Sequence, residues 1–124
     1  MQRLQHDAHS ATTLPAITDS QGAVRIAKHV LDSIIELAIM EVEGVARLAP
    51  VSSPWPRLLR AEPQRGIATN VRGKTLSVDL YIILRPGVPM AQVGHAVQEA
   101  VAKSIEDILG LTPGEINVYI QDIA

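Results

Sequence analysis

The sequence predicts an α+β fold of two layers, in which two amphipathic helices pack on one face of a small mixed β-sheet of three to four strands. Two segments repeat apolar residues at spacings of three and four, which indicates helices. Other segments alternate apolar and polar residues, which indicates half-buried strands. Hydrophobic residues make up 47% of the 124 residues, and there is no Phe, so an aliphatic core between helices and sheet is expected.

Residues 1–19 are interpreted as a flexible N-terminal tail that precedes a single domain over residues 20–124. The tail is polar and its apolar residues have no sustained period. His6, Asp7 and His9 lie close together there, but no further ligands accompany them. No metal site is therefore expected.

The first helix is expected after capping residues at 18–21, and Gly44 is placed to end it in the left-handed conformation. Residues 24–26 fit either its first turn or a short strand, and periodicity leaves both open. His29 falls on the polar side of this helix. The expected buried stripe contains Val24, Ala27, Val30, Leu31, Ile34, Ile35, Ala38 and Val42.

A short candidate strand at residues 45–48 leads into a proline-rich segment, which predicts a long loop over residues 49–65. Trp beside Arg is typical of binding anchors, so the loop is a candidate partner-binding segment. The alternative is that its Trp and Leu residues cover an edge of the core. The residues that suggest binding are Trp55, Arg57, Arg60 and Arg65.

A β-hairpin is predicted at residues 67–71 and 76–84, because Gly73 can supply the turn between them. A second helix begins at Pro89, and Gly110 with Leu111 fits a Schellman stop. Gly94 interrupts this helix, which suggests close backbone packing there. The expected buried stripe contains Val93, Ala96, Val97, Ala100, Val101, Ser104, Ile105 and Ile108.

A last strand follows at residues 116–120, so strand, helix and strand form a βαβ unit with parallel strands. One sheet face is then covered by the helices. The opposite face is expected to carry polar side chains and both tyrosines, namely Ser77, Asp79, Tyr81, Asn117, Tyr119 and Gln121. Tyr81 and Tyr119 are therefore candidate partner-binding residues.

Composition excludes several kinds of chemistry. The chain has no Cys, which removes disulfides and thiolate chemistry. It has no nucleophile motif and no phosphate-binding loop, so no enzymatic activity and no cofactor are expected. Between residues 47 and 85 lie seven basic and two acidic residues, a charge of +5 in a chain of net charge −2. That asymmetry indicates either a docking surface or a solvated face.

Location follows from what the N-terminal region lacks. The first residues do not resemble a secretory signal, and no apolar run reaches the ~18 residues of a membrane span. A cytoplasmic location is therefore expected.

Several fragments occur in the order found in the alkaline-shock-protein family of envelope stress response proteins, which the chain resembles from Gly22 to Ile123. They include Glu41-Val42-Glu43-Gly44-Val45, Val78-Asp79-Leu80-Tyr81, Gly87-Val88-Pro89, Val97-Gln98-Glu99-Ala100-Val101 and Ile116-Asn117-Val118. The resemblance implies a protein without known catalytic activity, associated with bacterial cell-envelope stress and in some members held at the membrane by a partner protein. The loop that contains Pro-Trp-Pro differs in sequence from the corresponding loop of the family. The resemblance therefore implies no function for this loop.

The expected function is that of a non-catalytic protein-interaction or scaffold module. Two kinds of partner are expected as alternatives: another protein, which could be anchored in the membrane, or a second copy of the chain. No small-molecule substrate is expected. The alternative is a single-stranded nucleic-acid binding module, because an open sheet face with tyrosines and basic loops can stack bases. That alternative requires Arg57, Arg65, Arg72 and Lys74 to surround the tyrosine-bearing face.

Overall fold

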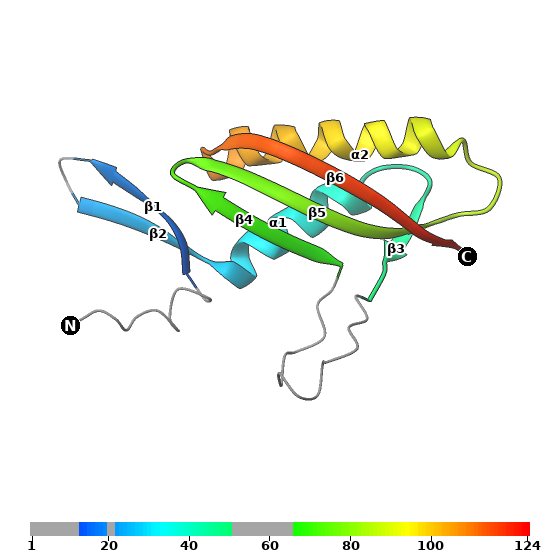
Figure 1. The fold of residues 1–124 in the computed structure, drawn as a ribbon, viewed down its shortest axis with the longest axis horizontal. Helices are drawn as coiled ribbons and strands as arrows, with labels where there is room; N and C mark the ends of the chain where they lie inside the picture. The colour runs from blue at the N-terminus through cyan, green and yellow to red at the C-terminus, as the bar shows by residue number, and fades with distance from the viewer. Residues whose placement is uncertain (1–12, 20–21, 51–65) are drawn as a thin grey trace.

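The computed structural model describes residues 13–19, 22–50 and 66–124. Its elements are strands and helices in the order given by Figure 1. Trp55, Arg57, Arg60 and Arg65 lie outside the described residues, as does most of the predicted 49–65 loop. The elements are β1 (Thr13–Asp19), β2 (Gly22–Ala27), α1 (Lys28–Met40), β3 (Val45–Leu48), β4 (Ile67–Arg72), β5 (Thr75–Leu84), α2 (Met90–Ser104), the π-helix η2 (Ile105–Leu109) and β6 (Thr112–Ile123).

The central strand of the main sheet is β5, which is paired along both edges. On one edge β6 runs parallel to it, from Thr75 opposite Thr112 to Leu84 opposite Ile123. On the other edge β4 pairs antiparallel with the first part of β5 and β3 pairs antiparallel with its end. The predicted mixed sheet, and the parallel relation of the strands on either side of the second helix, are both confirmed.

The core lies between this sheet and the two helices, as the two-layer prediction required. Figure 1 shows α1 and α2 behind the same face of the sheet. Alternate residues of β5 are buried toward the helices, because side chains alternate across a strand. The core side chains with no exposed surface are Leu31, Ile35, Ile39, Leu76, Leu80, Ile82, Leu84, Val97, Val101 and Ile105.

A second, two-stranded sheet was not predicted. β1 and β2 form an antiparallel hairpin, which Figure 1 shows beyond one end of the main sheet. Residues 13–19, which were assigned from the sequence to a flexible tail, thus form the strand β1. Residues 24–26 belong to the strand β2, which decides the alternative left open by periodicity. The capping residues at 18–21 do not cap α1, whose N-cap is Ala27 without a side-chain hydrogen bond.

The helix ends differ partly from expectation. α1 ends at Met40, and Gly44 adopts a positive φ of 103° where the chain enters β3 instead of capping the helix. Gly110 has φ 71° and ends the second helical segment, as predicted. The last turn is wide, because the N–H groups of Gly110 and Leu111 both donate to the Ile105 carbonyl.

Three residues assigned to buried stripes are exposed. Val24 is 60% exposed because it lies on the hairpin, and Val30 is 41% exposed because it points away from the sheet. Ile108 is 63% exposed because the π-helix rotates it outward. Gly94 also differs from expectation, since a Cβ added there would meet nothing within 4 Å. Close packing therefore does not explain this glycine.

Candidate functional site

The sheet face away from the helices is built by alternate residues of β4, β5 and β6. Ser77, Asp79 and Tyr81 are partly buried on this side of β5, between core residues that point to the helices. Across the parallel pairing, Asp79 lies opposite Asn117 and Tyr81 lies opposite Tyr119. The predicted polar, tyrosine-bearing face is therefore present. Its role in partner binding stays a prediction.

The two tyrosines form a stacked pair. Their ring centroids are 4.9 Å apart and the ring planes differ by 16°. Stacking arises directly from the register, which places the two residues side by side on neighbouring strands. Tyr119 remains 43% exposed, so part of the stacked pair is open to solvent on this face.

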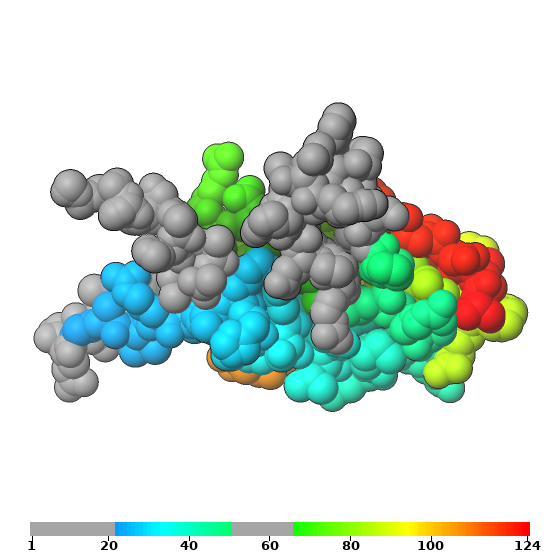
Figure 2. All heavy atoms as spheres, turned by 90° about the horizontal axis from the view of Figure 1, so that it is seen from below, coloured from blue at the N-terminus to red at the C-terminus, as the bar shows by residue number. Residues whose placement is uncertain are grey.

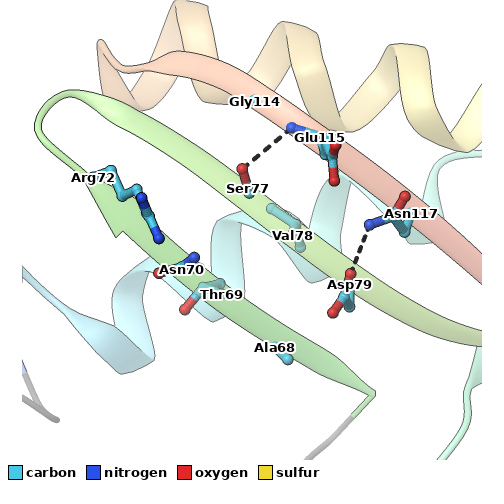
Figure 3. Close-up of a pocket in the computed structure, with 10 residues that line it drawn as sticks. All are labelled: Ala68, Thr69, Asn70, Arg72, Ser77, Val78, Asp79, Gly114, Glu115 and Asn117. Atoms are coloured by element: carbon cyan, nitrogen blue, oxygen red, sulfur yellow. Dashed lines mark hydrogen bonds between the residues drawn. The ribbon is translucent and has the colours of Figure 1, made fainter.

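A shallow polar cavity of about 630 Å³ lies on the same face. Figure 3 shows side chains from β4, β5 and β6 around it. Its lining comprises Ala68, Thr69, Asn70, Arg72, Ser77, Val78, Asp79, Gly114, Glu115 and Asn117. The lining includes one basic residue, Arg72, and two acidic residues, Asp79 and Glu115.

Hydrogen bonds across the β5–β6 boundary hold the cavity floor. The Asn117 side-chain amide donates to Asp79 Oδ1 at 2.9 Å, and the Glu115 backbone N–H donates to Ser77 Oγ at 3.2 Å. Figure 3 marks both bonds. The Asp79 carboxylate thus faces an amide, which neither supplies nor removes a proton at neutral pH. An acid–base couple is not formed by this pair.

Gly114 allows β6 to approach Ser77 closely on this part of the face. The register slips between Leu76 and Val78, so β6 carries an extra residue next to Gly114. A Cβ at Gly114 would collide with Ser77 Oγ and lie 3.0 Å from Thr75 Cγ2. Sequence reasoning did not identify Gly114 or the Asp79–Asn117 pair. The available signal was a glycine near the start of the predicted last strand.

The basic residues are only partly placed on this face. Arg72 lines the cavity, and Figure 3 shows its side chain extending along the sheet toward Asn70. Lys74 is exposed in the turn between β4 and β5. Of the four basic residues required for nucleic-acid binding, Arg57 and Arg65 lie outside the described residues, and Arg72 is the one in the cavity lining.

A second cavity, of about 600 Å³, lies between the C-terminal end of α1 and the N-terminal end of α2. It is formed where the chain leaves α1 and where α2 begins. Its walls are mostly apolar, and its lining comprises Val42, Glu43, Gly44, Val88, Pro89, Gln92, Val93 and Ala96. Gly44 is required there, because a Cβ would lie 2.9 Å from Val93 Cγ2.

Titratable residues outside the sheet face lie on the helices. His29 and His95 are both exposed, and for His29 this was predicted from its helical position. His95 Nδ1 is 3.1 Å from Gln98 Oε1, and Gln98 Nε2 donates to the Ile116 carbonyl at 2.9 Å.

The hydrogen bond from Lys103 to Asp107, together with the negative charge of Asp107, raises the pKa of Lys103 above its usual value. Among residues 13–19, 22–50 and 66–124, His, Asp and Glu form no group of three able to hold a metal.

The family is identified by comparison with protein-family models. Residues 16–124 match the model of alkaline shock protein 23, which is described as having a cell envelope-related function. The chain belongs to the alkaline shock protein 23 family. The match covers every described element of the main sheet and both helices, so the family resemblance predicted from sequence fragments is confirmed.

Curated relatives come from two bacterial species. An uncharacterized protein, Spy1614, of Streptococcus pyogenes serotype M6 is 30% identical over 111 residues, covering 86% of this chain and 92% of that protein. The uncharacterized protein YloU of Bacillus subtilis is 26% identical over 106 residues, covering 82% of this chain and 88% of that protein. YqhY of the same species is 27% identical over 104 residues, covering 82% of this chain and 77% of that protein.

Solved structures of the MamM CTD have a similar fold. A triple-substituted form has a TM-score of 0.53 at 17% identity, covering 77% of this chain and 94% of the other. A nickel form has a TM-score of 0.52 at 18% identity and covers 76% of this chain and 96% of the other. These values relate the folds alone. In the described part of this family member, neither helix is long and apolar enough to cross a membrane.

Proposed function

We propose that this alkaline shock protein 23 family member is a non-catalytic interaction module of the cell-envelope stress response that binds a protein partner on its open sheet face. In this proposal it acts in the cytoplasm and reaches the membrane through a membrane-anchored partner. The observation that carries the proposal is the stacked Tyr81–Tyr119 pair, which lies on the face left uncovered by the helices.

The chemistry of this face supports binding. Aromatic residues contribute a large share of interface energy, because they bury much surface and lose few rotamers. Tyr119 supplies an exposed ring, and the adjacent cavity supplies donors on Arg72 and both a donor and an acceptor on Asn70. A partner segment that covers the rings and enters the cavity would combine apolar burial with polar specificity.

An enzyme is less well supported. Catalysis by acid–base chemistry needs a carboxylate or imidazole next to a group that exchanges protons. In the cavity, Asp79 is instead bonded to the Asn117 amide. The two histidines of the described residues, His29 and His95, lie on the helices and outside the cavity lining.

Nucleic-acid binding remains the second candidate, because Arg72 lines the cavity on the tyrosine-bearing face. Single-stranded nucleic acid would stack on the tyrosines. However, the two rings stack on each other, which leaves each with one free face. A protein partner needs no intercalation between the rings and fits this arrangement better.

The test is capture of partners from cytosolic and membrane fractions by the wild type, Tyr119→Ala and Ile108→Ala. Ile108 is the matched control, since it is 63% exposed but lies on η2. We expect the Tyr119→Ala variant alone to lose a specific protein. Retention of the same proteins by all three would contradict the proposal.

Salt and nucleic acid separate the two candidates. Contacts dominated by Arg72 should weaken above physiological ionic strength, where the screening length is about 8 Å, whereas burial of the tyrosine rings should persist. We expect capture to survive high salt and nuclease treatment. Binding of a labelled single-stranded oligonucleotide that is lost in Tyr119→Ala and at high salt would favour the nucleic-acid candidate instead.

A further inference from the structure

The outward side of α1 carries an apolar stripe that the core does not use. Every exposed residue of α1 and its C-cap falls on this side: His29, Val30, Ser33, Leu37, Met40 and Glu41. At ~100° per residue these positions span about 120° of the helix surface. They lie directly opposite the buried stripe that includes Leu31, Ile35 and Ala38.

Three apolar side chains of the stripe are exposed to solvent. Leu37 is 65% exposed, Met40 is 42% exposed and Val30 is 41% exposed. In Figure 2 the cyan atoms of α1 form a continuous part of the molecular surface. Apolar residues at spacings of seven and three form the a and d positions of a helix–helix seam. The helix therefore has a second side suited to packing on another helix.

The order of residues along the stripe is self-complementary. If a second α1 lies antiparallel and centred at Ile35, then His29 faces Glu41, Val30 faces Met40 and Ser33 faces Leu37, each pair occurring twice. A two-fold axis makes every pair occur twice, and with this centre none of the three apolar residues meets a charged one. Large apolar residues then meet one another or a small serine, and polar residues meet at both ends.

Charge favours the same arrangement. Lys28 and His29 begin α1 and Arg25 precedes it on β2, while Glu41 and Glu43 follow its C-terminal end. Lys28 is already paired with Asp32 at 2.7 Å, so Arg25 and His29 are the groups open to a partner. An antiparallel pair also aligns opposite ends of the helix dipoles. A parallel pair would place like charges together at both ends.

We infer that the outward face of α1 is a homodimer surface, on which a second copy packs its own α1 antiparallel. This inference does not depend on the proposed function, because the helices and the tyrosines lie on opposite sides of the sheet. A contact of one helix pair is small, so a weak, concentration-dependent dimer is expected. The chain would then present two open sheet faces in one particle.

Sedimentation equilibrium of the full chain tests the inference with Leu37→Asp and the control Ile108→Asp. Both residues are exposed, so neither change should unfold the chain, which circular dichroism will check. We expect the dissociation constant to rise at least ~10-fold in Leu37→Asp, because a carboxylate is buried in an apolar seam. Ile108→Asp and Tyr119→Ala should change it less than about twofold. Equal dimerisation of all variants, or a wild type that is monomeric at ~1 mM, overturns the inference.

Crosslinking tests the orientation, because the natural chain contains no Cys. At ~1.5 Å rise per residue, an antiparallel pair separates the two copies of position 29 by about 18 Å, too far for a disulfide. Oxidation should therefore link His29→Cys to Glu41→Cys when the two single variants are mixed. Neither variant should crosslink alone. Rapid crosslinking of His29→Cys with itself would overturn the antiparallel arrangement.

Discussion

Single glycines reveal where the fold tolerates no side chain. Gly66 has φ +82°, and a Cβ there would lie 2.6 Å from the carbonyl oxygens of both Ala49 and Tyr81. Its own carbonyl accepts from the Tyr81 N–H at 2.8 Å, while the Ala49 N–H donates to the Tyr81 carbonyl at 2.8 Å. Gly66 therefore sits where β3 and β4 meet along one edge of β5.

We predict that Gly66→Ala lowers the free energy of unfolding by more than about 2 kcal/mol, because backbone atoms on both sides cannot move away. Gly73→Ala is the matched control. It also has a positive φ, of 61°, but nothing lies within 4 Å of its Cβ position. Gly73→Ala should therefore lower the free energy of unfolding by only ~1 kcal/mol, the conformational cost of a positive φ for a residue with a Cβ. Urea denaturation of both variants checks this, and equal losses would contradict the packing explanation.

Gly94 is predicted to behave in the opposite way. It lies inside α2 with open space around its Cβ position. Gly94→Ala should raise the free energy of unfolding by up to about 1 kcal/mol, because alanine has the higher helix propensity. Gly114→Ala, in which the Cβ collides with Ser77 Oγ, should be destabilising. A Gly94→Ala variant less stable than wild type in thermal melts would refute this account.

At the scale of elements, Gln98 joins the second layer to the sheet edge. Gln98 lies outside the predicted buried stripe of the second helix, but its amide donates to the Ile116 carbonyl on β6. That carbonyl belongs to the outer edge strand, where no strand among the described residues supplies a donor. The hydrogen bond therefore compensates for missing strand pairing.

We predict that Gln98→Ala costs about 1–2 kcal/mol of stability, since it leaves the Ile116 carbonyl without this donor. Gln92→Ala on the same helix is the control, because Gln92 is exposed. Hydrogen exchange should also become faster in β6 for Gln98→Ala alone. Identical unfolding curves for the two variants would show that the contact does not stabilise the edge.

The main elements were predictable because they bury one side. β5 alternates along its length and α2 repeats at helical spacing, and both patterns follow from packing against one core. The hairpin β1–β2 was missed because Gly22, Ala23, Val24 and Arg25 are all exposed, so burial imposes no pattern on them. The π-helix was missed because one extra residue per turn leaves no clear signal in composition.

At the scale of the whole molecule, the candidate site depends on a register that the sequence does not specify. The prediction that Tyr81 and Tyr119 share a face needed only alternation along each strand. Their stacking, and the Asp79–Asn117 bond, need the parallel pairing of β5 with β6 and its bulge near Gly114. Residues 38 positions apart were therefore brought together by tertiary structure.

The two faces of the molecule have different predicted roles. The sheet face combines an aromatic pair with a polar cavity, whereas the outward side of α1 has a self-complementary apolar stripe. A substitution on one face should therefore abolish partner binding or dimerisation without affecting the other. A dimer would offer two sheet faces, which raises the effective concentration for a partner that is itself clustered at a membrane.

Photo-crosslinking in living cells of the source organism tests whether the sheet face binds a protein partner. A photoreactive residue is placed at Tyr119 on the sheet face, with Ile108 on η2 as the control position. The account predicts that Tyr119 crosslinks to a specific protein other than the chain itself and that Ile108 does not. Absence of any specific protein adduct at Tyr119, in cells where the chain is folded and abundant, would contradict it.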